Sequence, residues 1–282
     1  MKRLLAVFTI AGGAAFSVAG GAGAVAATAA SPTVGGPMIR ASETAARASS
    51  SAPTISLNWS GYAATSSKKF NYVHSEFVQP AVTCPGKPKQ FTSNWVGLDG
   101  FNDETVEQDG TYGYCGGPDH TTPQYAAWYE MYPAGSVNVF RVRPGDVIDA
   151  TVQYTAGKFV LTIADLSTGK SATTSAACAS CERASAEWIV ERPAGCSASG
   201  CFLFALADFG TTTMSEDIAT AGAGSAKGIS SFTNYPIFMV GPLKKGYITL
   251  DTVGGVDNST DSFTATWDRS GKPTPITLGP SR

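Results

Sequence analysis

Short segments rich in Val, Ile, Thr and aromatic residues recur along most of this chain, each bounded by Gly, Pro, Asn, Asp or Ser. No segment shows sustained helical periodicity with caps, and only 215–220 could form a single helical turn. The segments predicted to be strands are 58–63, 71–78, 91–98, 125–132, 147–154, 159–165, 186–191, 202–209, 237–240 and 263–267. Many short strands without helices predict an all-β protein, a two-sheet antiparallel β-sandwich or jelly roll.

The N-terminus has the pattern of a targeting signal. Lys2 and Arg3 precede an apolar stretch, and Ala-x-Ala sites follow within residues 1–29. An uncleaved membrane anchor is less favoured, because glycine and alanine dilute the apolar run. We therefore expect residues 1–29 to be a secretory signal peptide and the mature protein to be secreted. Residues 30–53 are rich in Ala, Ser, Thr and Pro, and composition alone does not separate a propeptide from a flexible linker. Residues 54–282 fit one β-domain.

The balance of acidic and basic residues limits the kinds of molecule that the mature protein can bind. Without the signal, 18 basic residues face 22 acidic ones, a net charge of −4. This argues against nucleic acid or an anionic membrane as the partner. The chain has two histidines, and it carries no HExxH, GxSxG or phosphate-binding glycine motif. His74 and His120 have no convincing triad partner, so a histidine-based nucleophilic site is disfavoured. No metal or other cofactor is expected.

An even number of cysteines in an exported chain predicts disulfides. Among fifteen connectivities of six cysteines, the local pairs 178–181 and 196–201 with a longer 84–115 bridge are our preferred choice, and the cysteines concerned are Cys84, Cys115, Cys178, Cys181, Cys196 and Cys201. Zinc is the alternative for Cys178 and Cys181, but no second close-spaced pair completes a tetrahedral site.

Two predicted strands place carboxylates among apolar residues. Strand alternation puts Glu187, Ile189 and Glu191 on one face of 186–191, and Trp188 on the other, core-facing side. In 125–132, Trp128, Glu130 and Tyr132 share a face. Carboxylates in such surroundings can have altered proton affinity, which is useful in catalysis. The competing interpretation is a surface strand with solvated acids.

Motifs in a fixed order carry a resemblance to a known family. They are Asn58-Trp59-Ser60-Gly61-Tyr62, Trp95-Val96-Gly97-Leu98-Asp99-Gly100 with Gln108, Ala127-Trp128-Tyr129-Glu130-Met131-Tyr132-Pro133, Ala186-Glu187-Trp188-Ile189-Val190-Glu191 and Ala207-Asp208-Phe209-Gly210. Together they cover nearly the whole mature domain, which resembles the glutamic peptidases of the eqolisin (G1) family. The resemblance implies a concanavalin A-like sandwich of two curved antiparallel sheets, with a cleft on the concave face.

The resemblance also implies site residues. The catalytic glutamate falls on Glu187 and the catalytic glutamine on Gln108. Trp95 matches a tryptophan that lines the site, and the other supporting or substrate-binding positions are Asp99, Glu130, Trp128 and Tyr132. The family glutamine is usually followed by Thr-Gly, whereas Asp109 follows Gln108 here. An added carboxylate at that place could alter the pH profile or bind a propeptide cation.

The implied activity is that of a secreted, pepstatin-insensitive acid endopeptidase in which Glu187 activates water and Gln108 stabilises the oxyanion. The implied partners are protein or peptide substrates, and we expect a monomer. One alternative is a non-catalytic carbohydrate- or peptide-binding β-sandwich module. Another is a glycoside hydrolase that uses Glu187 with Glu130, which would require two acids facing each other across a groove.

Overall fold

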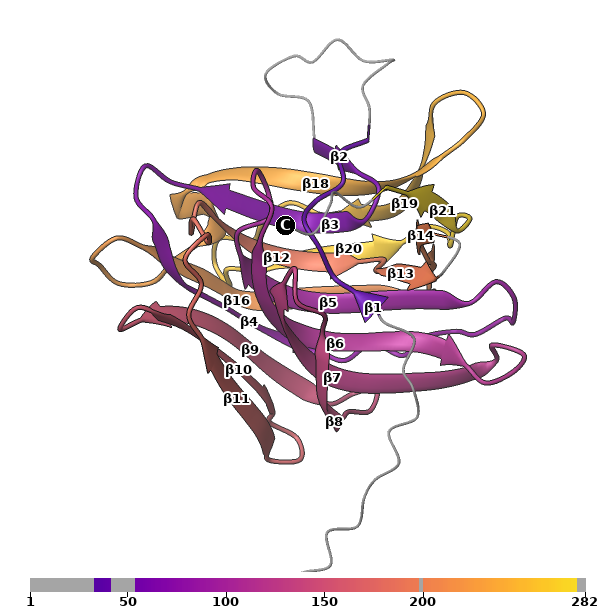
Figure 1. Cartoon of the computed structure of the whole chain (residues 1–282), viewed down its shortest axis with the longest axis horizontal. Coiled ribbons are helices and arrows are strands. Elements are labelled where there is room, and N and C mark those ends of the chain that lie inside the picture. The colour runs from indigo at the N-terminus through magenta and orange to yellow at the C-terminus, as the bar shows by residue number, and fades with distance from the viewer. Residues whose placement is uncertain (1–32, 42–53, 198–199, 278–282) are drawn as a thin grey trace, which may run out of the picture. The chain divides into compact units, whose positions relative to one another are not determined.

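The computed structural model describes residues 33–41, 54–197 and 200–277 (Figure 1). The predicted signal peptide, 1–29, and most of the predicted propeptide or linker, 30–53, lie outside these residues. Within the described part of the chain, no helix is long and apolar enough to cross a membrane. The chain is nearly all β, as predicted, with one short 3₁₀ turn at Ile229–Ser231.

Most strands join one continuous ladder that folds into two layers (Figure 1). The first layer runs in the order β8 (Val137–Arg141), β7 (Thr122–Tyr132), β6 (Val106–Gly116), β5 (Gln90–Leu98), β12 (Ser185–Glu191), β3 (Trp59–Thr65) and β18 (Thr233–Pro242). The second runs in the order β16 (Thr211–Ala221), β4 (Phe70–Val78), β9 (Val147–Thr155), β10 (Lys158–Asp165) and β11 (Lys170–Ala176).

The strands β19 (Tyr247–Val253) and β20 (Phe263–Trp267) connect the two layers, because β19 pairs with β18 and β20 pairs with β16. Short strands flank this ladder: β2 (Thr54–Ser56), β15 (Ala205–Leu206) and β17 (Lys227–Gly228). A separate small sheet contains β1 (Thr33–Val34), β13 (Ala194–Ser197), β14 (Gly200–Leu203) and β21 (Thr274–Ile276). Among the described strands, all pairings are antiparallel except β2 with β18 and β15 with β5.

The first layer has two apolar faces. One face packs against the second layer and supplies the main core, with members such as Val96, Leu98, Trp188 and Val190. The opposite face carries a smaller apolar cluster that includes Trp59, Trp95, Trp128 and Ile189. The alternation predicted for 186–191 is therefore confirmed, since Trp188 faces the main core and Ile189 faces away. The second face holds the candidate site.

Three of the element predictions need correction. The segment 106–116, which contains Gln108, was not predicted as a strand and forms the long strand β6. The expected helical turn at 215–220 is part of strand β16, where a bulge between Ser215 and Ile218 places Glu216 at φ 53° and disturbs the alternation. The predicted strand 202–209 is divided between β14 and β15.

The disulfides follow the preferred pairing. Cys84 bonds to Cys115, Cys178 to Cys181, and Cys196 to Cys201. The last of these bridges joins directly opposed residues of β13 and β14. A zinc site at Cys178 and Cys181 would need both thiolates, and their sulfurs are bonded to each other here.

Candidate functional site

A row of residues in register crosses four strands of the first layer. Glu130 on β7 opposes Gln108 on β6, Gln108 opposes Gly97 on β5, and Gly97 opposes Glu187 on β12. Directly opposed residues of antiparallel strands point to the same face. These side chains therefore share the face that carries Trp95 and Trp128, and Gly97 leaves the middle of the row without a side chain.

Gln108 and Glu130 form a buried pair. Gln108 Nε2 donates to Glu130 Oε2 at 2.8 Å, and both residues have no exposed surface. Burial raises the pKa of Glu130 well above its ordinary range, and the charge of Glu191 raises it further. Among the described residues, Gln108 Oε1 has no hydrogen-bond partner. An amide with a free acceptor beside a protonated acid can orient a water or a polar substrate atom.

Glu191 is held by donors on the same face. Trp95 Nε1 donates to its Oε2 at 2.9 Å, and Asn58 Nδ2 donates to its Oε1 at 3.2 Å. Burial raises the pKa of Glu191 to about 8, although these two hydrogen bonds act to lower it. Glu191 also lines a small cavity together with Trp128 and Gly35. The charge of Glu191 raises the pKa of Glu130, which in turn is hydrogen-bonded to Gln108. Gln108, Glu130 and Glu191 therefore form one interacting cluster.

Glu187 lies in a different environment. Its pKa is raised well above its ordinary range, chiefly by burial and further by the nearby acids Asp99, Asp103 and Glu107. The hydroxyl of Ser185 is its hydrogen-bonding neighbour, but no well-formed hydrogen bond reaches either carboxylate oxygen from the described residues. Glu187 thus shares a face with Gln108 but is grouped electrostatically with other carboxyls.

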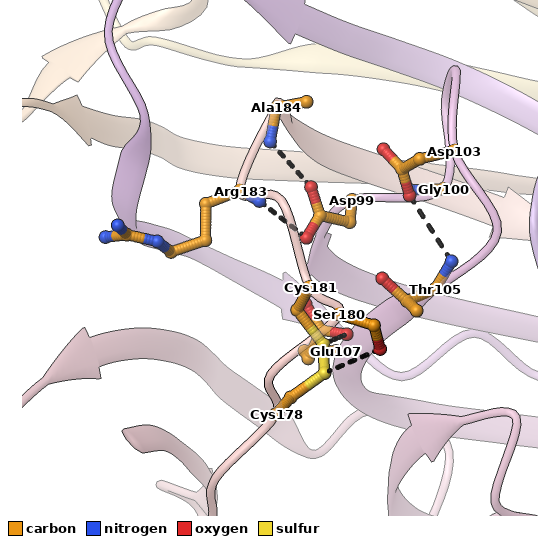
Figure 2. The surroundings of a disulfide bond; sticks show 10 residues. All are labelled: Asp99, Gly100, Asp103, Thr105, Glu107, Cys178, Ser180, Cys181, Arg183 and Ala184. Atoms are coloured by element: carbon orange, nitrogen blue, oxygen red, sulfur yellow. Dashed lines mark hydrogen bonds between the residues drawn. A yellow bond between two sulfur atoms is a disulfide. The ribbon is translucent and has the colours of Figure 1, made fainter. Parts of the chain in front are cut away.

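Asp99 organises the loop beside this acidic cluster. It adopts φ 72° and accepts hydrogen bonds from the backbone N–H groups of Arg183 (2.7 Å) and Ala184 (2.6 Å), as Figure 2 shows. Cys181 Sγ lies 2.8 Å from Glu107 Oε1. Burial raises the pKa of Glu107 to about 10, with Asp99 adding to the effect. Asp99 therefore anchors the chain that leads into β12, and it does not reach Gln108 through any described contact.

Asp109 does not share the face of the sheet on which the Gln108 side chain lies. Being next in the strand, it points to the opposite face, and it is fully buried between the two layers. Burial raises its pKa well above the ordinary range, and the charge of Asp149 on β9 raises it further. The expectation that Asp109 adds a carboxylate to the site or binds a propeptide cation is therefore wrong, because strand alternation directs it into the core.

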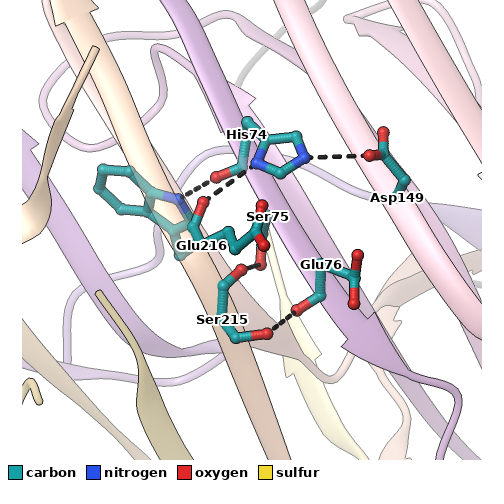
Figure 3. Close-up of polar contacts among 7 residues, drawn as sticks. His74, Ser75, Glu76, Asp149, Ser215 and Glu216 are labelled. Atoms are coloured by element: carbon teal, nitrogen blue, oxygen red, sulfur yellow. Dashed lines mark hydrogen bonds and ion pairs between the residues drawn. The ribbon is translucent and has the colours of Figure 1, made fainter. Parts of the chain in front are cut away.

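His74 has partners that the sequence did not reveal, and they lie in the second layer. Its Nε2 is 3.1 Å from Asp149 Oδ2 and its Nδ1 is 3.0 Å from the carbonyl oxygen of Glu216 (Figure 3). Burial lowers its pKa, but the hydrogen bonds and charges of these two acids outweigh burial and raise it. The neighbouring Ser75 donates to the Ser215 carbonyl and not to the histidine. This set is therefore not a nucleophilic triad.

The aromatic residues predicted for the site lie on the same face of the first layer as Gln108. Trp95 and Trp128 belong to the apolar cluster of this face, and Tyr132 packs against it. Trp59 joins them, with its ring centroid 4.9 Å from that of Trp95. Asn58 is the contributor that sequence reasoning missed, although it precedes Trp59 in a motif already noted. The contact of its amide with a carboxylate is visible only in three dimensions.

A two-layer antiparallel sandwich with a glutamine buried among glutamates and tryptophans is the architecture expected of a glutamic peptidase. The family model described as the Peptidase A4 family matches residues 57–248. The chain belongs to this family of glutamic peptidases, as its motifs indicated.

Individual proteins that are similar to this chain support the same family membership. Aspergillopepsin-2 of Aspergillus niger is 35% identical over 182 residues, which are 62% of this chain and 58% of that protein. The match thus spans somewhat more than half of the relative's length. The solved structure of scytalido-glutamic peptidase with a transition-state analogue inhibitor superposes with a TM-score of 0.63 at 21% identity, covering 75% of this chain and 98% of the other.

A second solved structure supports the same fold. SCP-B, a member of the eqolisin family in complex with the tripeptide Ala-Ile-His, has a TM-score of 0.61 at 20% identity, with the same coverage. At these identities the two structures establish the sandwich architecture, and the family model establishes the membership.

Proposed function

We propose that this chain is a secreted acid endopeptidase that hydrolyses peptide bonds with a glutamate-activated water and a glutamine, and that it is insensitive to pepstatin. Its substrates are proteins or peptides. Three disulfides support an oxidising, extracellular location. The observation that carries the proposal is the buried group of Gln108, Glu130 and Glu191 on the tryptophan-rich face.

The geometry supports Glu191 as the glutamate of the pair. The sequence motif assigned this role to Glu187, which stays a prediction. Glu191 is oriented by Trp95 and Asn58, lines a cavity and interacts with the partner of Gln108. Glu187 lacks such donors and is surrounded by acids. A general base needs a fixed orientation, and Trp95 and Asn58 give this to Glu191.

In the proposed reaction, ionised Glu191 takes a proton from a water that attacks the scissile carbonyl, and then gives the proton to the leaving amine. The Gln108 amide donates to the developing oxyanion. Because an amide does not titrate in this range, this donor persists in acid. Trp95, Trp128 and Tyr132 shape the cleft, while Glu130 positions Gln108 and Asp99 fixes the approach to β12.

The pH dependence follows from the carboxyls. Burial raises the pKa of Glu191 to about 8. Entry of water and substrate would reduce this burial, so we expect Glu191 to work with a lower pKa during the reaction. Protonation of the leaving amine also favours acid. We expect maximal cleavage at acidic pH.

The test is digestion of a denatured protein between pH 2 and 7 in the presence of pepstatin, with Glu191→Gln, Glu187→Gln and Gln108→Ala compared with the wild-type chain. Glu191 and Glu187 are buried glutamates on one face of one strand, so each substitution controls for the other. We expect a loss of roughly 10²–10⁴-fold or more in Glu191→Gln, a loss of about 10²–10³-fold in Gln108→Ala, and less than about tenfold in Glu187→Gln.

The reverse order, with Glu187→Gln inactive and Glu191→Gln active, would return the catalytic role to Glu187. Retained activity in Gln108→Ala with loss in a Glu130 variant would instead favour two carboxyls in the reaction. Folded protein that has been freed of its N-terminal segment and cleaves nothing at any pH would overturn the peptidase proposal and favour the binding-module alternative.

A further inference from the structure

The face of the first layer that holds the candidate site continues beyond it along the strands. β5, β6 and β7 lie side by side (Figure 1), and alternation brings every second residue of each strand to this face. On β6, Tyr114 shares the face with Gln108 and opposes Phe91 of β5. On β12, Glu191 opposes Ser93 of β5. Tyr114 and Phe91 therefore lie beyond Glu191 in the direction away from Gln108.

A small cavity connects the proposed acid to this part of the face. Phe91 and Tyr112 line it together with Glu191. Tyr112 also packs against the tryptophan cluster. The Phe91 ring centroid lies 5.2 Å from that of Tyr112 and 5.2 Å from that of Tyr114. A peptide bound at Glu191 can therefore continue over a floor of aromatic rings.

Two cations lie at the far end of this aromatic floor. Lys89 immediately precedes β5, and its Nζ lies 4.9 Å from the ring centroid of Tyr114 and 5.4 Å from that of Phe204. Arg141, at the end of β8, opposes Ala126 of β7 and so shares the face. Burial raises the pKa of Tyr114, and the positive charge of Arg141 opposes that rise. Lys89 and Arg141 are therefore both close to Tyr114.

Neither cation has an acid partner in the described part of the chain. No carboxylate there lies within the ion-pair distance of 4.0 Å from the Lys89 ammonium or the Arg141 guanidinium. Lys89 is half-buried, and burial lowers its pKa. It nonetheless keeps its proton in acid, because lysine side chains ordinarily titrate near about 10. A half-buried cation without a counter-charge is stabilised when a ligand brings an anion to it.

We propose that Lys89 and Arg141 form a cationic subsite that selects peptide substrates with an acidic side chain on one side of the scissile bond. This inference rests on the proposed function. Lys89 precedes Ser93, which opposes Glu191, by four residues of extended chain, or about 13 Å. An extended peptide covers that distance in about four residues. The substrate carboxylate binds between the ammonium and the guanidinium, beside the Tyr114 ring.

Paired peptides test the subsite. The two members differ only by Glu or Gln at one position, which is placed in turn at each of the four positions on either side of the scissile bond. At pH 5, one position should give a kcat/KM about five- to tenfold higher for Glu than for Gln, through a lower KM. At pH 2.5 the preference should vanish, because the peptide glutamate is then protonated.

Variants assign the preference to the two cations. Lys89→Met keeps an apolar side chain against Tyr114 and Phe204 but removes the charge, and it should lower the Glu-to-Gln ratio to about threefold or less. Lys89→Arg should retain the ratio, and Lys89→Met combined with Arg141→Gln should abolish it. Lys158→Met is the matched control, because it removes an exposed lysine at the turn between β9 and β10. It should keep the wild-type ratio.

A wild-type ratio near one at every position would overturn the subsite while leaving the peptidase intact, and so would a ratio that the double variant leaves unchanged. Fluorescence anisotropy of the same peptides, labelled, at pH 5 reports the subsite without catalysis. If wild type cleaves neither peptide but binds the Glu peptide about five- to tenfold more tightly, and the double variant loses this difference, the peptidase proposal fails and the subsite stands. Equal binding of the two peptides in that case would overturn the subsite as well.

Discussion

At the scale of single residues, strand alternation decides what each acid can do. Gln108 and Asp109 are neighbours in sequence, yet one faces the tryptophan cluster and the other faces the core between the layers. A carboxyl confined to an apolar interior is stable there mainly in its protonated form. The acid at position 109 therefore affects the stability of the protein rather than the site.

Substitution of Asp109 by asparagine should make stability less dependent on pH. Burial raises the folded-state pKa of Asp109, so its contribution is fully present below the unfolded pKa of about 4 and is lost as pH rises. The asparagine side chain cannot ionise, so Asp109→Asn should be more stable than wild type by about 1–3 kcal/mol at pH 7 and nearly equal at pH 3. Urea unfolding at the two pH values measures this. A larger gain at pH 3 than at pH 7 would contradict it.

At the scale of elements, the hairpin of β9 and β10 joins two strands that the sequence predicted. The two strands pair in register up to Thr155 and Lys158, and the connection is Ala156-Gly157. Both residues have positive φ, 49° and 78°, which is the pattern of a two-residue type I′ turn. Alanine is poorly suited to the first of these positions, because its Cβ crowds the backbone in the left-handed region.

Replacement of Ala156 by asparagine should stabilise the hairpin, because Asn-Gly is the preferred pair for this turn. We expect a gain of about 0.5–1 kcal/mol in unfolding free energy. The residue is exposed, so no packing change offsets it. Ala156→Val is the control and should destabilise the protein, since a β-branched residue tolerates positive φ worse. The melting temperatures of both variants, compared with that of the wild type, test this prediction. Equal melting temperatures would contradict the assignment of a type I′ turn.

At the scale of the whole molecule, the protein buries many carboxyls. Burial raises the pKa of each of the following groups: Glu107, Asp109, Glu130, Glu187, Glu191, Asp217 and Asp251. Burial raises the pKa of Glu191 and that of Asp251 to about 8. All of them bind protons more tightly in the folded state than in the unfolded chain, where carboxyls titrate near about 4.

Stability should therefore be highest in acid and fall as pH rises from about 4 to about 8. In that range the unfolded chain holds fewer protons than the folded one, so the unfolding free energy decreases as pH rises. Denaturant midpoints measured at pH 3, 5 and 7 should decline in that order. A midpoint that rises between pH 3 and 7 would show that the buried carboxyls are ionised in the folded protein.

The sequence by itself determined the strand-rich architecture and the motifs of the family, because these depend on local composition, alternation and spacing. The disulfide pairs were a preferred choice among fifteen connectivities, and the structure shows them directly. The sequence also predicted Gln108, Trp95, Trp128 and Glu130 as site residues, and the structure brings their side chains to one face of the first layer. Sequence reasoning missed strand β6, since glycines and acids within 106–116 hide the alternation.

The tertiary structure alone decided which carboxyls meet. Glu187 and Glu191 look equivalent along β12, but Trp95 and Asn58 reach only Glu191, and these donors come from segments distant in sequence. It also placed the backbone of Gly35 against Gln108, a contact between residues far apart in the chain that glycine makes possible. Sequence patterns report which face a side chain takes. The neighbours it finds there depend on how the strands are ordered and curved, and that order is set by long-range packing.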